Sequence, residues 1–217
     1  MLAVKRLHLA ELEVIGERWP VHGFVVTHPG GALLVDTGVG GPDDVLSDWR
    51  VVNRTAADAL ADIDMSPADI GLVINTHLHF DHCGQNAVFS HAPCYVQRAE
   101  HERAQVESRE LFDWFGFMNA RFELLDGDTE IVPGVRVIAT PGHTSGHQSV
   151  LVGVGDGVDV LIGDAAYTTT LFRAPDGARL PPGQAADRTA WAASLERIKS
   201  QDPARVHFCH DTAVIHG

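Results

Sequence analysis

Short apolar runs separated by polar turns recur along most of the chain, and this pattern predicts a fold rich in strands. Residues 23–38 (GFVVTHPGGALLVDTG) contain two β-type runs around a His-Pro-Gly-Gly turn, which predicts a β-hairpin. Residues 71–76 form a short apolar segment that is typical of a buried strand. Further β-type runs occupy residues 92–97, 122–125, 129–132, 135–140, 149–154, 159–164 and 205–211.

Three segments have helical character. Residues 55–63 begin with Thr55, a good N-cap residue, and continue with helix-forming side chains. Residues 98–122 are first charged and then aromatic, and residues 187–200 are amphipathic. Strands interleaved with helices predict an α/β fold, and a single α/β domain over residues 1–217 is the simplest organisation.

The composition narrows the function classes. The chain has 16 basic and 29 acidic residues, a net charge of −13, which argues against nucleic acid as a partner. The sequence contains no run of about 18 apolar residues, so a membrane-spanning helix is not expected. Charged residues interrupt the N-terminal segment where a signal peptide would be apolar. The three cysteines are few and odd in number, which indicates reduced thiols and a cytoplasmic location.

The segment HLHFDH at residues 77–82 carries the strongest chemical signal. His77 and His79 are two residues apart, so on an extended chain they point to the same side. Asp81 keeps this phase if the chain stays extended, whereas His82 reaches the same region only after a turn. Imidazole and carboxylate groups are ligands that suit Zn²⁺, so His77 and His79 are candidates for one metal ion and Asp81 and His82 for a second.

More ligands are needed to complete two metal sites. His143, Asp164 and His210 each follow an apolar strand-like run at the point where it gives way to a loop, a common location for sites in α/β proteins. Asp164 has two carboxylate oxygens and is therefore suited to bridge two cations.

The motifs HLHFDH, TPGHTSGHQS, GDA and CHD occur in the order found in the metallo-β-lactamase superfamily. Within that superfamily, VQRAEHERAQ, PGHTSGHQS and DAAY resemble the N-acyl homoserine lactonase branch, which degrades quorum-sensing signals. The resemblance covers roughly residues 20–211. It implies an αβ/βα sandwich, in which two mixed β-sheets are flanked by helices.

The resemblance also implies a dinuclear zinc hydrolase that opens the ring of a small-molecule lactone by attack of a metal-bridging hydroxide. One Zn²⁺ would be held by His77, His79 and His143. The second would be held by Asp81, His82 and His210, with Asp164 as the bridge. Tyr167 is expected to donate a hydrogen bond to the oxyanion that develops on the lactone carbonyl, and Asp81 is expected to carry a proton from the hydroxide to the leaving ring oxygen.

Other residues near the motifs are expected to have roles outside the ligand set. Asp36 is expected to orient a ligating histidine by hydrogen bonding to it. His147 is expected to be structural, whereas His22 either lines the pocket or packs in the core. Cys83 and Cys209 flank candidate ligands and are expected to be buried thiols. The aromatic segment at residues 111–118 is either helix core, a wall for an acyl chain, or both.

Four alternatives have different requirements. A thioester or ester hydrolase of the glyoxalase II type would use the same metals but needs a cationic site, and no Lys/Arg cluster lies near the motifs. A redox protein with two irons would be expected to carry an additional flavin-type domain. A noncatalytic metal-binding module would not need Tyr167, and a nuclease is disfavoured by the net charge. The sequence does not predict the oligomeric state.

Overall fold

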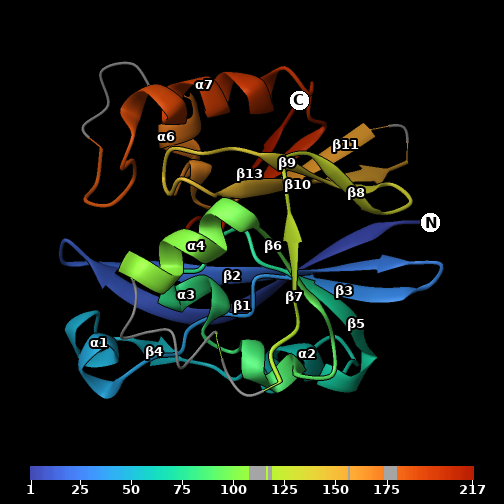
Figure 1. Cartoon of the computed structure of the whole chain (residues 1–217), viewed down its shortest axis with the longest axis horizontal. Coiled ribbons are helices and arrows are strands. Elements are labelled where there is room, and N and C mark those ends of the chain that lie inside the picture. Colours follow the sequence, from blue (N-terminus) through green and yellow to red (C-terminus); the bar gives the residue numbers. More distant parts are fainter. Residues whose placement is uncertain (108–115, 117–118, 156, 174–179) are drawn as a thin grey trace.

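Two mixed β-sheets pack face to face in the computed structural model, and helices cover their outer faces (Figure 1). The structure describes residues 1–107, 116, 119–155, 157–173 and 180–217. One sheet has seven strands in the order β4-β1-β2-β3-β5-β6-β7, and the other has six in the order β13-β12-β11-β10-β9-β8. This arrangement is the αβ/βα sandwich that the resemblance implies.

The first sheet combines an antiparallel half with a parallel half. Its strands are β1 (Ala3–Val14), β2 (Glu17–His28), β3 (Gly31–Val35), β4 (Val52–Asn53), β5 (Ile70–Ile74), β6 (Cys94–Gln97) and β7 (Phe122–Leu125). The predicted hairpin is confirmed, because β2 and β3 are antiparallel with His28 opposite Gly31. Strand β1, which the sequence analysis did not assign, pairs with β2 along most of its length. From β3 through β5 and β6 to β7 the strands run parallel.

The second sheet consists of β8 (Thr129–Val132), β9 (Val135–Ala139), β10 (Gln148–Val154), β11 (Gly157–Leu161), β12 (Arg205–His207) and β13 (Val214–His216). All of these were expected from the apolar runs except β13. Strand β10 is antiparallel to both β9 and β11, and β12 is parallel to β11. Strands β9, β11 and β12 therefore point the same way, and their carboxyl ends lie at one edge of the sheet.

Helical segments connect the strands. They are α1 (Asp43–Asp48), α2 (Ala56–Ala61), α3 (Phe80–Cys83), α4 (Arg98–Glu107), α6 (Thr169–Arg173) and α7 (Arg188–Lys199). The predicted helices at 55–63 and 187–200 are confirmed, and the side chains of Thr55 and Asp187 cap α2 and α7. The expected helix at 98–122 begins as α4 and ends at Glu107 in the described residues. None of the described helices has the length and apolar character needed to span a bilayer.

Apolar packing occurs in three layers. Side chains such as Phe24, Leu33 and Ile74 of the first sheet meet Val137 and Leu161 of the second. Helix α2 packs below the first sheet, and α7 packs above the second through Trp191, Leu195 and Ile198 (Figure 1). This apolar packing fixes the position of one sheet relative to the other, so that the ends of strands from both sheets meet at a common edge.

The close approach of the backbone at Gly84, which follows α3, to the backbone of Gly40 leads to a testable prediction. A Cβ atom at Gly84 would collide with the backbone of Gly40, because the two chain segments touch there. We expect Gly84→Ala to lower the free energy of unfolding by about 1–3 kcal/mol, the usual cost of overpacking. Denaturant unfolding should show this loss. In the control variant Gly71→Ala, the nearest atom to the new Cβ is 3.7 Å away, and the change should stay within about 0.5 kcal/mol. Equal effects of the two substitutions would contradict this explanation.

Candidate metal centre

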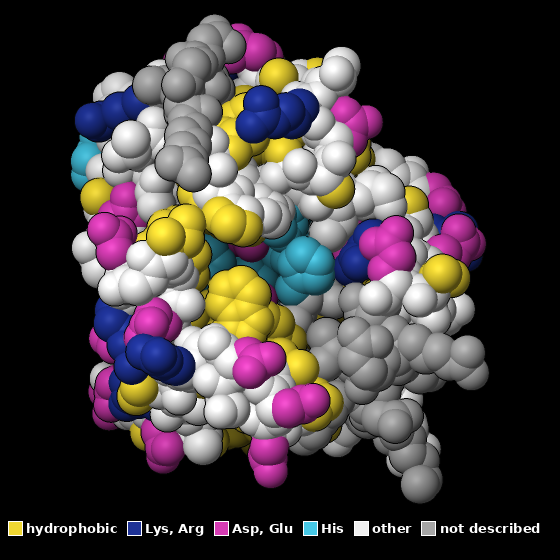
Figure 2. Space-filling view, turned by 90° about the vertical axis from the view of Figure 1, so that its left-hand side faces the viewer, with side chains coloured by type: hydrophobic (Ala, Val, Ile, Leu, Met, Phe, Trp, Pro, Cys, Tyr) yellow, Lys and Arg dark blue, Asp and Glu magenta, His cyan; other side chains and the backbone are white. Residues whose placement is uncertain are grey.

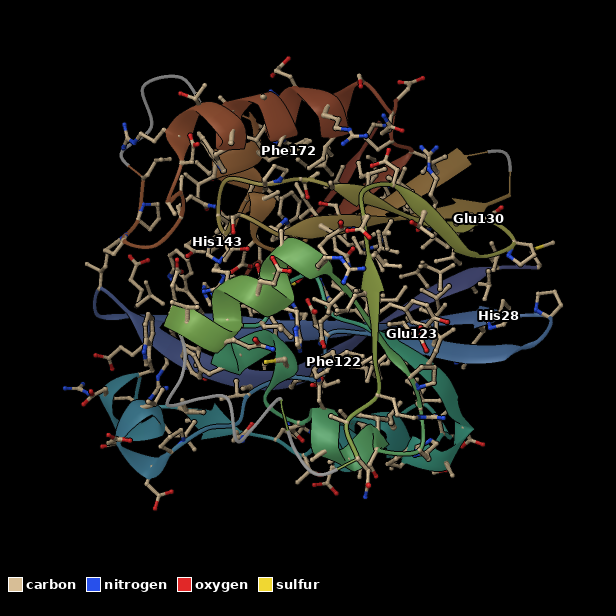
Figure 3. The ribbon with its side chains drawn as sticks, viewed as in Figure 1. His28, Phe122, Glu123, Glu130, His143 and Phe172 are labelled. Atoms are coloured by element: carbon tan, nitrogen blue, oxygen red, sulfur yellow. The ribbon has the colours of Figure 1, made fainter. Side chains whose placement is uncertain are left out.

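The candidate ligands from both sheets meet at one edge of the sandwich. Space-filling Figure 2 shows histidine side chains at the base of a hollow with apolar side chains around it. Figure 3 places His143 at this edge and His28 at the opposite edge. The seven candidates lie on or after five elements: His77 and His79 after β5, Asp81 and His82 on α3, His143 after β9, Asp164 after β11 and His210 after β12.

His77, His79 and His143 form the first cluster. The Nε2 atom of His77 lies 3.0 Å from Nδ1 of His79, and Nε2 of His143 lies 3.1 Å from the first and 3.0 Å from the second. Burial lowers the pKa of all three imidazoles, that of His143 to about 4. The rings are therefore neutral near pH 7, with lone pairs available for a cation.

Asp81, His82 and His210 form the second cluster. Nε2 of His210 lies 3.5 Å from Oδ2 of Asp81, and Nε2 of His82 lies 3.6 Å from the same oxygen. The chain is extended to His79 and enters a helical turn at Phe80, so Asp81 does not continue the phase of an extended segment. The turn instead directs both Asp81 and His82 toward the centre, as the sequence analysis required for His82.

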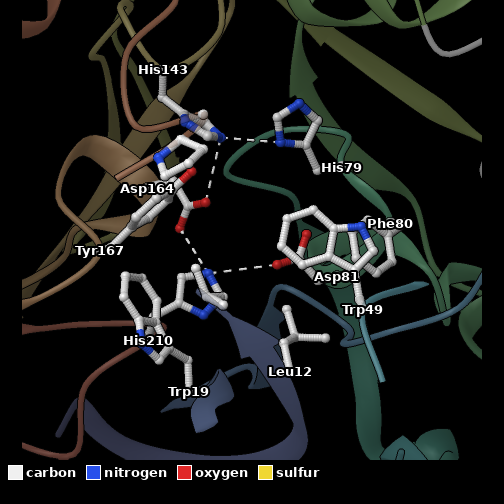
Figure 4. A pocket seen from close by; sticks show the side chains of 13 residues that line it. Leu12, Trp19, Trp49, His79, Phe80, Asp81, His143, Asp164, Tyr167 and His210 are labelled. Atoms are coloured by element: carbon white, nitrogen blue, oxygen red, sulfur yellow. Dashed lines mark hydrogen bonds and ion pairs between the residues drawn. The ribbon is translucent and has the colours of Figure 1, made fainter. Parts of the chain in front are cut away.

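Asp164 lies between the two clusters (Figure 4). Its Oδ2 atom is 3.4 Å from Nε2 of His143 and 3.3 Å from Nε2 of His82, and its Oδ1 atom is 3.3 Å from Nε2 of His210. Burial acts to lower the pKa of His82 and of His210, but the carboxylate of Asp164 and that of Asp81 raise both above the usual value. Burial likewise acts to raise the pKa of Asp164, and the two histidines hold it well below its usual range.

Two buried atoms at this centre lack a hydrogen-bond partner in the described residues: Nε2 of His82 and Oδ1 of Asp164. A buried polar atom without a partner costs free energy, so such atoms point to a missing ligand. Imidazole nitrogens and carboxylate oxygens are the donors that Zn²⁺ takes in proteins. The side chains that converge here therefore fit divalent metal ions.

Asp36 orients the imidazole of His82 through the ring nitrogen that faces away from the centre. Its Oδ2 atom lies 2.8 Å from Nδ1 of His82, as the sequence analysis expected, and its two oxygens also accept the N–H and the hydroxyl of Thr76. The residue adopts a φ of 58°, a left-handed conformation that aspartate tolerates better than most residues. His210 is held in a similar way, since its Nδ1 atom lies 2.9 Å from the carbonyl oxygen of Pro20. In both rings Nε2 is left to face the centre.

Gln184 contacts three residues of the site, and its role was not predicted from the sequence. Its buried side chain donates to the carbonyl oxygen of Asp164 at 2.8 Å and accepts the N–H of Tyr167 at 3.0 Å. Its own carbonyl oxygen lies 3.3 Å from Nδ1 of His143. No local pattern marks such a residue, because its role depends on chain segments that are distant in the sequence.

The ring of Tyr167 lies between His143 and His210, with centroid distances of 5.6 Å and 5.4 Å. Burial and then the charges of Asp164 and Asp81 raise the pKa of Tyr167 well above its usual value. The hydroxyl therefore stays protonated and can donate a hydrogen bond into the site.

His147 and His22 have structural contacts. Nε2 of His147 accepts the N–H of Asp164 at 2.9 Å, in agreement with the structural role expected for this residue. His22 is buried, with Nδ1 3.3 Å from the carbonyl oxygen of Phe208, and it does not line the cavity above the site. The structure therefore favours the packing alternative for His22.

The three cysteines are buried and unpaired by disulfides. The Sγ atom of Cys83 donates to the carbonyl oxygen of His79, and that of Cys209 lies 3.9 Å from Oδ2 of Asp36. Burial raises the pKa of Cys209 to about 12, which keeps it a thiol when no metal is bound to it. That neither thiol ligates metal stays a prediction.

A cavity of about 260 Å³ opens above the cluster. His79, Asp81, His143, Asp164, Tyr167 and His210 form its polar side, and its apolar side consists of Leu12, Val14, Trp19, Trp49, Phe80 and Pro182. Trp49 packs against Phe80, and Trp19 packs against Tyr167 (Figure 4). This wall was not predicted from the sequence. Its candidate wall at 111–118 lies outside the described residues except for Gly116.

Comparisons with known proteins agree with the fold. The sequence profile of the Metallo-beta-lactamase superfamily matches residues 16–210. An N-acyl homoserine lactonase of Bacillus cereus is 32% identical over 211 residues, which span 88% of this chain and 81% of the relative. The N-acyl homoserine lactonase AttM of Rhizobium radiobacter is 29% identical over 229 residues, which span 91% of this chain and 81% of the relative.

A solved structure of an N-acyl homoserine lactone hydrolase has the product N-hexanoyl-L-homoserine bound at its catalytic metal center. It superposes with a TM-score of 0.78 at 26% identity, and the match covers 97% of this chain and 93% of the other.

The opposite pKa shifts in the two clusters predict that metal binding releases protons. His82 and His210 hold protons to a higher pH than an ordinary histidine does, and a metal must displace those protons. Metal affinity should therefore fall as the pH is lowered. Calorimetric titration of the metal-free protein with Zn²⁺ at pH 7, in two buffers of different ionisation enthalpy, should give heats that differ between the buffers. Identical heats would show that no net proton leaves.

Proposed function

The chain belongs to the metallo-beta-lactamase superfamily, and from this premise we propose that it is a metal-dependent hydrolase that opens the lactone ring of N-acyl homoserine lactones. The observation that carries the proposal is the convergence of the two clusters around Asp164, at the base of a cavity with one polar and one apolar side. The curated relatives named N-acyl homoserine lactonase support the substrate class.

The proposed cofactors are two Zn²⁺ ions per chain. His77, His79 and His143 would hold one, Asp81, His82 and His210 would hold the other, and Asp164 would contact both. Bound zinc would supply a water of lowered pKa and would polarise the carbonyl group of the lactone. The grouping is supported by the two clusters and by the position of Asp164 between them.

The chain's own residues would then move protons and hold charge. Tyr167, with its protonated hydroxyl, would donate a hydrogen bond to the carbonyl oxygen as it gains negative charge. Asp81 lines the cavity. It would take a proton from the attacking water and then deliver that proton to the ring oxygen when the carbon–oxygen bond of the lactone breaks. The proton count balances, because the product has one new carboxylate and one new hydroxyl, and one proton from water is released.

The shape of the cavity favours a substrate with a polar head and an apolar tail. The lactone would lie over the histidines, and the acyl chain would lie along Trp49, Phe80 and Leu12. The glyoxalase II alternative needs cations for an anionic thiol carrier. No Lys or Arg lines this cavity in the described structure. Arg103 lines a neighbouring cleft, but Glu100 and Glu107 already pair with it.

Metal content tests the proposed cofactors. We expect purified protein loaded with zinc and then freed of excess metal to retain two ions per chain, as measured by elemental analysis. Replacing Cys209 with Ser should leave this content unchanged, since the proposed ligand set does not include the thiol. Retention of at most one ion by the wild type would contradict the dinuclear site, and loss of one ion in Cys209→Ser would assign the thiol as a ligand.

Tyr167→Phe tests the catalytic role of the hydroxyl. The variant should keep its metal and lose about 10²–10³-fold in kcat, the usual effect of removing one oxyanion donor. Tyr95→Phe is a matched control, because Tyr95 is the only other tyrosine and lies in β6. An unchanged rate in Tyr167→Phe would exclude this role.

A substrate comparison tests the reaction class. With the wild-type protein, N-acyl homoserine lactones should be hydrolysed faster than linear thioesters of the same acyl length. Faster turnover of the thioesters would support the glyoxalase II alternative.

A further inference from the structure

We infer that Glu100 is a positioning residue that ties together the two chain segments carrying His77, His79 and His143. The inference rests on the proposed metal site and adds to it a residue whose hydrogen bonds and ion pair go to Leu78, Thr144 and Arg103 and not to the proposed ligand side chains. Glu100 lies in the first turn of α4 and is fully buried.

The carboxylate of Glu100 bonds to both segments. Its Oε1 atom accepts the backbone N–H of Leu78 at 2.9 Å, and Leu78 lies between His77 and His79. Its Oε2 atom accepts the hydroxyl of Thr144 at 2.6 Å, and Thr144 follows His143. The first segment follows β5 of one sheet and the second follows β9 of the other. One carboxylate therefore connects the two sheets at the level of the candidate ligands.

Backbone packing reinforces the second of these contacts. Gly146 lies against the first turn of α4, and a Cβ atom there would collide with the backbone and Cβ of Glu100. Only a residue without a side chain allows the His143 segment to approach α4 so closely. The hydroxyl of Thr144 is thereby brought to the carboxylate.

The charge of Glu100 is balanced by Arg103, which is one turn further along the helix. The guanidinium group lies 2.7 Å from Oε1, and the arginine side chain is only 9% exposed. A buried ion pair seldom stabilises a fold more than apolar residues of the same size would. A positioning role explains why a carboxylate is buried at this point. Its two oxygens can accept hydrogen bonds from the segments of Leu78 and Thr144 and can pair with Arg103 at the same time.

The fold does not depend on this link alone. The two sheets are also joined by the backbone N–H of Gln148, which donates to the carbonyl oxygen of Thr76 at 2.9 Å. The second cluster is held by other groups, since Asp36 orients His82 and Pro20 orients His210. Loss of the Glu100 link should therefore loosen the first cluster while the protein stays folded.

Thr144 offers a nearly isosteric test. In Thr144→Val the hydroxyl that binds Glu100 is lost, and in Thr144→Ser it is kept. We expect Thr144→Val to weaken binding at the His77–His79–His143 cluster by about 10–100-fold, the range for partners that orient metal ligands. Thr144→Ser should remain close to the wild type. Glu100→Gln, which removes the charge that pairs with Arg103, should weaken the same cluster.

The measurement is a titration of metal-free protein with Co²⁺, followed by its visible absorption. His143→Ala marks which absorption band belongs to the first cluster. Thermal unfolding with and without metal provides a second readout, because a positioning role reduces the stabilisation by metal more than it reduces the stability of the metal-free protein.

The outcomes separate this inference from the proposed function. Selective weakening of the first-cluster band in Thr144→Val and Glu100→Gln, but not in Thr144→Ser, supports the positioning role. Unchanged Co²⁺ affinities with a lower melting temperature of the metal-free variants would overturn it and leave Glu100 as a structural ion pair. Failure of the wild type to bind Co²⁺ would overturn both proposals. Metal binding by the wild type without lactone hydrolysis would overturn the proposed function alone.

Discussion

The carboxylate of Asp164 is buried between two groups of imidazoles, and the arrangement of the whole site depends on how firmly it is held there. Its backbone is fixed on both sides, since His147 accepts its N–H and Gln184 donates to its carbonyl oxygen. The preceding Gly163 has a φ of 59° and no room for a Cβ atom beside His147 and Thr76. Such close contacts leave the side chain little freedom, so both of its oxygens face histidines.

The topology brings the remaining groups to this carboxylate. Strands β3 and β5 run parallel in one sheet, and β9, β11 and β12 share one direction in the other. Their carboxyl ends meet where the sandwich opens, and each is followed by a loop that carries a candidate ligand or a residue that orients one. In general, loops at strand ends can change in sequence without disturbing the apolar layers, which is why chemistry of this kind is usually found there.

The sequence was sufficient where a feature is local. The cluster in HLHFDH spans six residues, and an apolar run that is followed by His143, Asp164 or His210 can be recognised without knowing the fold. Strand β1 could not be predicted in this way, because charged residues interrupt it and it is stabilised by long pairing with β2. The cavity wall was missed for a similar reason, since Trp19 and Trp49 come from separate segments that only the fold brings together. The contacts of Gln184 and Glu100 also join residues that are distant along the chain.

The buried carboxylates give a physical reason to expect a cation at this edge of the molecule. In the described structure five acidic side chains are buried: Asp36, Asp81, Glu100, Asp159 and Asp164. Glu100 pairs with Arg103 and Asp159 with Arg205, so each has a permanent positive charge beside it. Asp36, Asp81 and Asp164 have only histidines within ion-pair distance among the described residues, and a histidine is charged only while protonated. A buried carboxylate without a lasting counter-charge is costly. A divalent cation at each cluster would supply the positive charge that the chain itself provides elsewhere, and it would do so at the base of the cavity.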